Sequence, residues 1–290
     1  MLDTFEKTQI DAGGATIRLV KKGDRFPLLL LHGYPQTHLM WHKIAPRLAE
    51  EFTVVAPDLR GYGDSSKPED GPDHSNYSKR AMAQDLVTVM DKLGYQEFFV
   101  VGHDRGARVA HRMALDHPQR VKRLAVLDIA PTYKMYMTTD KVLATAYYHW
   151  FFLIQPYDLP ERLIGSQPEY YLRRCLASWS ADLAAFVPEA LAEYIRCFSN
   201  PATIHANCED YRAAATIDLQ HDEADLDQKV TCPLLVLWSA QGFVGRRYDV
   251  LETWRERATN VRGKALPGGH FLPEEAPEET YEALHEFLAT

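Results

Sequence analysis

The stretch VGHDRGARVA at residues 101–110 decides the fold that we predict for this chain. The apolar run EFFVV before it predicts a buried strand, and the run ARVAHRMALDH after it predicts a helix. Between them, GHDRG has the spacing of the sharp strand–turn–helix elbow that commonly presents a serine nucleophile, G-x-S-x-G. Here the central residue is Asp104, and Arg105 and Arg108 follow it. The stretch therefore predicts an elbow that presents a carboxylate in place of a hydroxyl.

Short apolar runs recur along the chain on both sides of this elbow. They read PLLLLH (27–32), FTVVAPD (52–58), EFFVVGH (97–103), KRLAVLD (122–128), CPLLVLWS (232–239) and NVRGKALPGGH (260–270). Runs that are apolar throughout are typical of strands covered on both faces, as in parallel sheets. Helical patterns occupy residues 77–93, 105–116 and 277–288, and residues 10–20 predict an N-terminal hairpin. The alternation predicts an α/β fold with a mostly parallel, doubly wound sheet.

The alternation of strands and helices breaks after the strand that ends at Asp128. Residues 131–225 are rich in aromatic side chains and contain no clear strand. We expect a helical cap domain over 131–225, inserted into a core domain made of residues 1–130 and 226–290. Ligands of open α/β sheets bind outside the carboxyl ends of the strands, so this insertion would cover the site.

Composition excludes several classes of protein. The chain has 290 residues, is 46% hydrophobic and carries a net charge of −8, whereas nucleic-acid-binding proteins are more often basic. The N-terminus MLDTFEKTQI lacks the apolar core of a secretory signal, and no apolar run is long enough to span a membrane. The four cysteines show no metal-binding spacing, which favours free thiols in a reducing compartment. We expect a cytoplasmic protein that binds neither nucleic acid nor membrane.

Polar residues follow several predicted strands and form a candidate active site. Asp104, Asp128 and His270 occur in the order nucleophile, acid, histidine that is typical of α/β-hydrolases. The backbone N–H groups of Tyr34 and Arg105 are the candidates for an oxyanion hole. An aspartate is already ionised at neutral pH and can attack a saturated carbon to form an ester. His270 would then activate water to hydrolyse that ester.

The acid partner of His270 can be inferred from an absence. In many enzymes with this order the acid follows the strand that here reads PLLVLWS. The chain continues with AQGFVGRRYD, and no carboxylate appears before Asp249. The preceding strand ends at Asp128, so we predict that Asp128 orients His270.

Arg105 and Arg108 lie in the first turn of the predicted helix, where they oppose the helix dipole and repel each other. Such a pair needs anions nearby. Asp104 supplies one, and a substrate carboxylate is a suitable second, since a guanidinium forms paired hydrogen bonds with it. The alternative is that both arginines pair with Asp85 or Glu97 on neighbouring elements.

The chain resembles the α/β-hydrolase dehalogenases, and specifically the fluoroacetate (haloacetate) dehalogenases. The resemblance runs nearly end to end. The motifs that carry it are HGYPQTHLMWH (32–42), PDLRGYGDSSKP (57–68), GHDRGARVAHR (102–112), LDIAPT (127–132), HWFF (149–152), CEDYRAAATID (208–218) and GGHF (268–271).

The resemblance implies roles for further residues. Arg105 and Arg108 match the arginines that hold the substrate carboxylate, and His149, Trp150 and Tyr211 match the halide-binding residues. It also implies a homodimer that needs no cofactor. Haloalkane dehalogenases carry a tryptophan directly after the nucleophile, where this chain has Arg105, and this difference favours an acid substrate.

Several alternatives stay open. An epoxide hydrolase uses the same aspartate and fold, with two tyrosines that Tyr147 or Tyr148 and Tyr211 resemble. A non-catalytic protein that binds small acids is a second alternative. Trp179 is a candidate for the wall of the access channel. His32, His38 and His42 invite a metal site, but no carboxylate or cysteine joins them at a ligand spacing, and we predict none.

Overall fold

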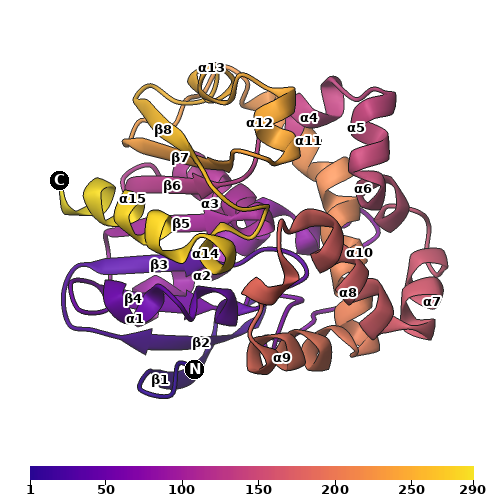
Figure 1. Ribbon diagram of the computed structural model, residues 1–290, viewed down its shortest axis with the longest axis horizontal. Helices are drawn as coiled ribbons and strands as arrows, with labels where there is room; N and C mark the ends of the chain where they lie inside the picture. Colours follow the sequence, from indigo (N-terminus) through magenta and orange to yellow (C-terminus); the bar gives the residue numbers. More distant parts are fainter.

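An eight-stranded sheet lies at the centre of the molecule (Figure 1). The structure is a computed structural model that describes residues 1–290. The strands are β1 (Glu6–Asp11), β2 (Thr16–Lys22), β3 (Pro27–Leu31), β4 (Thr53–Pro57), β5 (Phe98–His103), β6 (Val121–Leu127), β7 (Leu234–Ser239) and β8 (Val261–Leu266). Their order is β1-β2-β4-β3-β5-β6-β7-β8, and β2 is antiparallel to both β1 and β4. The remaining pairs are parallel, which confirms the predicted mostly parallel sheet.

The position of each strand in the sheet explains its sequence. Strands β3 (PLLLL) and β4 (TVVAP) are buried at every residue, since helices cover both faces of the sheet there. The edge strands β1 and β8 are partly exposed and carry charged residues. Continuous apolar runs therefore marked the central strands most clearly.

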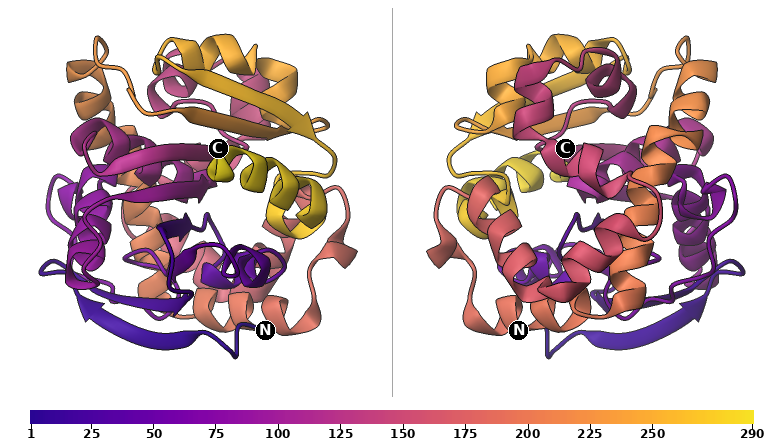
Figure 2. Two further views of the ribbon diagram at one scale, coloured as in Figure 1. Left: turned by 90° about the vertical axis from the view of Figure 1, so that its left-hand side faces the viewer. Right: turned by 90° about the vertical axis from the view of Figure 1, so that its right-hand side faces the viewer.

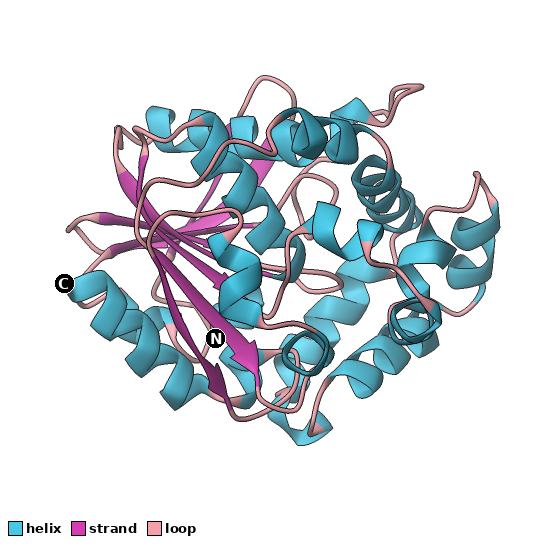
Figure 3. Cartoon of the chain, turned by 90° about the horizontal axis from the view of Figure 1, so that it is seen from above, coloured by secondary structure: helices cyan, strands magenta, loops and turns pink.

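Helices pack on both faces of the sheet (Figure 3). One core cluster joins the sheet to α2 (Lys79–Lys92), α3 (Asp104–Asp116) and α13 (Val250–Arg255). The other joins it to α1 (Ala45–Leu48) and α15 (Pro277–Ala289). The shorter helices outside the insertion are η1 (His38–Trp41), η2 (Ser75–Tyr77), α12 (Phe243–Arg247) and α14 (Leu272–Glu275). The doubly wound arrangement is thus confirmed.

The chain between β6 and β7 contains helices and no strand. These are α4 (Thr132–Met137), α5 (Lys141–Ala146), α6 (Tyr148–Leu153), α7 (Leu159–Ser166), α8 (Pro168–Trp179), η3 (Leu183–Ala185), α9 (Pro188–Phe198), α10 (Pro201–Ala215) and α11 (Ile217–Ala224). We call this stretch the helical segment. A proline occupies the first turn of α7, α8, α9 and α10. Backbone N–H groups in the first turn have no acceptor within the helix, so the missing N–H of proline costs no helical hydrogen bond there.

The helical segment lies at one end of the sheet (Figures 1 and 2). Hydrogen bonds show which end this is. Arg105, which follows β5, donates to Asp210 of α10, and the N–H of His270, after β8, donates to the carbonyl of Trp179. The segment therefore faces the carboxyl ends of the parallel strands, where the polar residues of the candidate site gather. No helix of the chain combines the length and the apolar character that crossing a membrane requires.

Candidate active site

Asp104 is the first residue of α3 and follows β5 directly, as the elbow predicts. Its φ of 46° lies in the left-handed region, which costs free energy in a residue other than glycine and turns the chain sharply. Gly106 makes this turn possible, since a Cβ there would lie 2.3 Å from the carbonyl oxygen of His32. Asp104 is buried, yet the positive charges of His270, Arg108 and other groups outweigh the effect of burial and lower its pKa. The carboxylate is therefore ionised at neutral pH.

His270 and Asp128 form a hydrogen-bonded pair beside Asp104. The Nδ1–H of His270 donates to Oδ2 of Asp128 at 2.7 Å, and Oδ1 of Asp128 accepts from the N–H of Ser239 at 2.9 Å. Burial alone would lower the pKa of His270, but the hydrogen bond and the charge of Asp128 outweigh it and raise that pKa above 6.5. His103 stabilises the loop that carries His270, since its Nε2–H donates to the carbonyl of His270 at 2.7 Å. The Nε2 atom of His270 is left free to act as a base.

The two predicted oxyanion donors differ in the structure. The N–H of Tyr34 donates to Oδ2 of Asp104 at 3.0 Å, whereas the N–H of Arg105 makes no hydrogen bond to that carboxylate. Gly33 allows the close approach of this loop, because a Cβ there would lie 2.6 Å from the Cβ of Asp104. His32 orients the loop through its ring, whose Nδ1–H donates to the carbonyl of Gly33 at 3.0 Å.

Arg105 is fully buried and pairs with an acid that sequence reasoning missed. Its Nη2 lies 2.6 Å from Oδ1 of Asp210, and its Nε lies 3.0 Å from Oδ2 of the same residue. Asp210 also accepts from Tyr62 Oη at 2.6 Å and from Lys79 Nζ. Only Nη1 of Arg105 is left without a hydrogen-bond partner. The second anion near the two arginines is thus supplied by the protein itself.

The alternative partners that the sequence offered for these arginines lie elsewhere. Asp85 pairs with Arg60, and Glu97 pairs with Lys122 on the surface. This alternative is therefore wrong for both arginines. Neither carboxylate forms an ion pair with Arg105 or Arg108.

Arg108 is a buried cation without an ion pair. It is 4% exposed, and its Nη1 donates only to neutral oxygens, the carbonyl of Ala130 at 3.0 Å and Oγ1 of Thr132 at 2.9 Å. Its Nε is buried with no hydrogen-bond partner, and its guanidinium lies 4.7 Å from the ring centre of Trp150. Burial lowers its pKa. A buried charge is unfavourable unless an anion pairs with it, so this position is suited to an anionic ligand.

Three aromatic residues of the helical segment lie close together and are buried. Tyr211 of α10 lies 5.8 Å from His149 and 6.4 Å from Trp150 of α6, measured between ring centres. The hydroxyl of Tyr211 and Nδ1 of His149 have no hydrogen-bond partner. Burial lowers the pKa of His149 to about 3 and raises that of Tyr211, so both side chains are neutral at pH 7. Buried polar atoms are normally paired, so these atoms are available to a ligand.

A cavity of about 310 Å³ opens beside Asp104. The residues that line it are Asp104, Asp128, Ala146, Tyr147, His149, Ser178, Trp179, Ser180, Ala181, Gln241, Gly242, Phe243, Arg246, Gly269 and His270. Five other predicted site residues do not line this cavity: Tyr34, Arg105, Arg108, Trp150 and Tyr211. The N–H of Tyr34 donates to Asp104, while Arg105 lies over the ring of Tyr211 and Arg108 over that of Trp150. Trp179, a candidate for the wall of the access channel, lines this cavity, and its ring centre lies 4.4 Å from that of His149.

Several residues around the site were not predicted. Gln241, Phe243 and Arg246 lie in the loop after β7, in the stretch AQGFVGRR. This stretch contains no carboxylate, but its position directly after a strand of the sheet is the sequence signal that places it at the site. Tyr62 and Asp210 lie within two of the motifs quoted above, but no local pattern shows that they meet Lys79 and Arg105, since only tertiary contacts bring these residues together.

Comparison with known proteins places the chain in a family. The family described as the alpha/beta hydrolase fold matches residues 27–277. The chain is 49% identical to a fluoroacetate dehalogenase from Burkholderia sp, over 100% of this chain and 95% of the relative, which confirms the resemblance inferred from its motifs. It is 37% identical to a soluble epoxide hydrolase from Corynebacterium sp. (strain C12), over 95% of this chain and 94% of the relative.

A solved structure agrees. ALR0039 from Nostoc sp PCC 7120, provisionally assigned as an α/β hydrolase, superimposes with a TM-score of 0.99 at 71% identity and 99% coverage of both chains. The fold and the sequence thus lead to one conclusion: this chain belongs to the α/β hydrolase fold family.

Proposed function

We propose that this protein hydrolyses haloacetates, and fluoroacetate in particular, to glycolate and halide. The observation that carries the proposal is the buried Arg108, which has no ion pair and lies one helical turn after an ionised Asp104. A substrate with a carboxylate next to its reacting carbon would supply the anion that Arg108 lacks. The fluoroacetate dehalogenase from Burkholderia supports this choice of substrate.

In the first step, a carboxylate oxygen of Asp104 attacks the carbon that bears the halogen. The new C–O bond forms an ester, and the C–halogen bond breaks as the halide leaves with its electron pair. Arg108 would hold the substrate carboxylate, and the unpartnered Nη1 of Arg105 would add a second donor. This geometry places the reacting carbon one bond away from the group that is held, which limits the freedom lost at the transition state.

In the second step, Nε2 of His270 takes a proton from water, and the hydroxide attacks the ester carbonyl carbon of Asp104. The N–H of Tyr34, 3.0 Å from Oδ2 in the resting structure, would stabilise the oxyanion. Breaking the acyl C–O bond releases glycolate and restores the carboxylate. The proton then leaves His270 for solvent. Asp128 stabilises the protonated imidazole in the interval.

Release of fluoroacetate's halogen tests the proposal directly. Incubation of the protein with fluoroacetate should yield fluoride, measured with an ion-selective electrode, and glycolate in equal amounts, while Asp104→Asn yields neither.

Styrene oxide is the matched substrate for the epoxide hydrolase alternative. Diol formation from it, without any fluoride from fluoroacetate, would reverse the choice. A rise in melting temperature with small acids and no turnover of either substrate would support the non-catalytic alternative.

The surroundings of the cavity favour an anionic substrate over an epoxide. A second, more open cavity of about 720 Å³ shares Ala146, Phe243 and Arg246 with the first. Lys141 adds a further cation to its wall, whereas the charge of Arg247, which also lines it, is paired with Asp140 at 3.1 Å. Because the whole chain carries a net charge of −8, a positive mouth offsets the repulsion that a small anion would meet. An uncharged epoxide gains nothing from it.

We infer that His149, Trp150 and Tyr211 bind the leaving halide. Fluoride needs strong hydrogen-bond donors, and each hydrogen bond to a charged group contributes about 1.5–3 kcal/mol. Tyr211→Phe should therefore lower kcat/KM for fluoroacetate about 10- to 100-fold. The loss for bromoacetate should be smaller, since bromide leaves readily. Steady-state kinetics on both substrates measure the ratio, and Tyr281→Phe on α15, outside the helical segment, is the control. An equal loss on both substrates would contradict a role in halide binding.

We also propose that residues 131–225 act as a cap and that two copies of the chain associate through it. Large apolar side chains are exposed on α6, α7 and α8, and burial against a second copy would remove them from water. They are Tyr148, Leu159, Leu163 and Tyr170. The homodimer that the family resemblance implies agrees with this surface. The cytoplasmic location stays a prediction.

A further inference from the structure

Glu275, at the end of α14, accepts three backbone hydrogen bonds that join the His270 loop to the helical segment. Its Oε2 accepts from the N–H of Gly269 at 2.9 Å, and its Oε1 accepts from the N–H of Phe271 at 2.9 Å. These two residues flank His270 in the sequence. The third bond comes from the N–H of Ala181, at 2.6 Å from Oε2. One carboxylate thus holds the loop of the proposed base on both sides and ties it to the chain that follows α8.

The two tied segments also contact each other directly. The N–H of His270 donates to the carbonyl of Trp179 at 2.9 Å. A Cβ at Gly269 would lie 2.5 Å from the backbone nitrogen of Ala181, so only glycine allows the segments to pack this closely. The ring of Trp179, on the cavity wall, lies 6.1 Å from that of His270. The loop of His270 and the segment Trp179–Ala181 are therefore in direct backbone contact, and both line the cavity.

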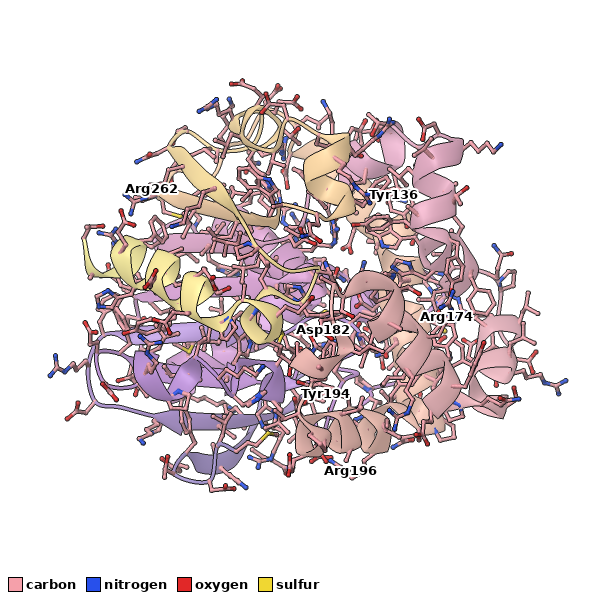
Figure 4. The ribbon with its side chains drawn as sticks, in the orientation of Figure 1. Tyr136, Arg174, Asp182, Tyr194, Arg196 and Arg262 are labelled. Carbon is pink, nitrogen blue, oxygen red and sulfur yellow. The ribbon has the colours of Figure 1, made fainter.

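The neighbouring residue, Glu274, also connects α14 to the helical segment. Glu274 accepts from Tyr194 Oη at 3.0 Å, on α9 of the helical segment. Figure 4 labels Tyr194 together with Asp182, which follows Ala181, on the side of the helical segment that faces α14. The carboxylate of Glu274 hydrogen-bonds only to Gln36 and Tyr194, so of the two carboxylates that of Glu275 alone accepts from the N–H groups that flank His270.

We propose that Glu275 is a positioning residue for ester hydrolysis. It holds His270 and the Trp179–Ala181 wall at the spacing that the attacking water needs. The proposal rests on the function proposed above, in which His270 acts only after the ester has formed. Loss of Glu275 should therefore slow the second step and leave the first nearly unchanged, because Asp104 and Arg108 lie on α3 and make no contact with it. A merely structural role would slow both steps.

The test compares the two steps in one variant. Glu275→Gln keeps the size of the side chain but replaces one acceptor oxygen with an NH₂ group, which cannot accept from a backbone N–H. We expect ester hydrolysis to slow about 10- to 100-fold, as for a small displacement of a catalytic group. The ester on Asp104 should then accumulate during turnover of fluoroacetate. Rapid quenching and intact-mass spectrometry measure its fraction over time.

Two further variants decide the interpretation. Glu279→Gln removes the same charge from an exposed position on α15 and should behave as the wild type. Glu275→Asp keeps the charge and should accumulate less ester than Glu275→Gln. Equal slowing of both steps in Glu275→Gln, or no change in either, would overturn the proposal. If His270→Asn accumulates ester and Glu275→Gln does not, the positioning role alone fails. If neither does, the proposed reaction fails.

Discussion

His270→Asn, incubated with fluoroacetate, should stop after one turnover with a carboxymethyl ester on Asp104. The first step uses only the ionised carboxylate, whose pKa is lowered by its charged neighbours, and needs no base. The second step needs a proton acceptor at Nε2 of His270, and an asparagine amide is not basic. Steady-state turnover should fall by about 10²- to 10⁴-fold, the usual contribution of a general base. One equivalent of fluoride per active site should still appear.

Intact-mass spectrometry of the His270→Asn protein measures this ester, and peptide mapping places it at Asp104. The double variant Asp104→Asn/His270→Asn is the control and should stay unmodified, since it lacks the nucleophile. Recovery of an unmodified His270→Asn protein, with no burst of fluoride, would contradict a two-step reaction. It would indicate instead that His270 activates water for direct attack on the substrate.

Arg108→Leu should lower kcat/KM for chloroacetate and fluoroacetate by about 10²- to 10³-fold, as for removal of one partner of a buried charge pair. Arg108 has no ion pair in the protein, whereas Arg105 is already paired with Asp210 at 2.6 Å. The substrate carboxylate therefore depends chiefly on Arg108. Arg108→Lys keeps the charge but loses the planar arrangement of donors, so its loss should be intermediate.

A neutral analogue separates recognition of the carboxylate from general damage to the site. Chloroacetamide has the shape of chloroacetate without its charge, so Arg108→Leu should change its turnover far less. The kcat/KM ratio of the two substrates is the measurement, with thermal unfolding as a check on folding. An equal loss on both would show that Arg108 acts through its bonds to Ala130 and Thr132, as a structural residue of the α3 N-terminus.

The sheet could be predicted from sequence because its central strands are buried on both faces and so read as unbroken apolar runs. The candidate triad could be predicted for a related reason: Asp104, Asp128 and His270 each follow a strand, and parallel strands end at one edge. The structure places these three together. Their roles, like those of the other site residues, stay predictions.

What the sequence did not indicate depends on contacts between distant residues. Arg105 and Asp210 are 105 positions apart, and no pattern around Asp210 shows that it turns toward α3. The roles predicted from sequence were therefore the same for Arg105 and Arg108, although in the structure Arg105 is paired with Asp210 and Arg108 has no ion pair. Glu275 was missed for a different reason. Its partners are backbone N–H groups, which every residue except proline carries and which leave no trace in a sequence.

The pairing of Arg105 has a consequence for how products leave. Asp210 and Asp218 face Arg105 and Lys79, so these four side chains together carry no net charge. Arg108 makes no ion pair with Asp104, but in total charge the two side chains cancel, so the carboxylate of a bound haloacetate would leave the site with one net negative charge. In the proposed reaction, the first step would move a charge from Asp104 to the halide and the second would restore it, so halide and glycolate would both lie beside a regenerated carboxylate. The halide, the glycolate and Asp104 would then place three negative charges around Arg108, because Arg105 is already paired with Asp210, and this repulsion would favour rapid release of both products.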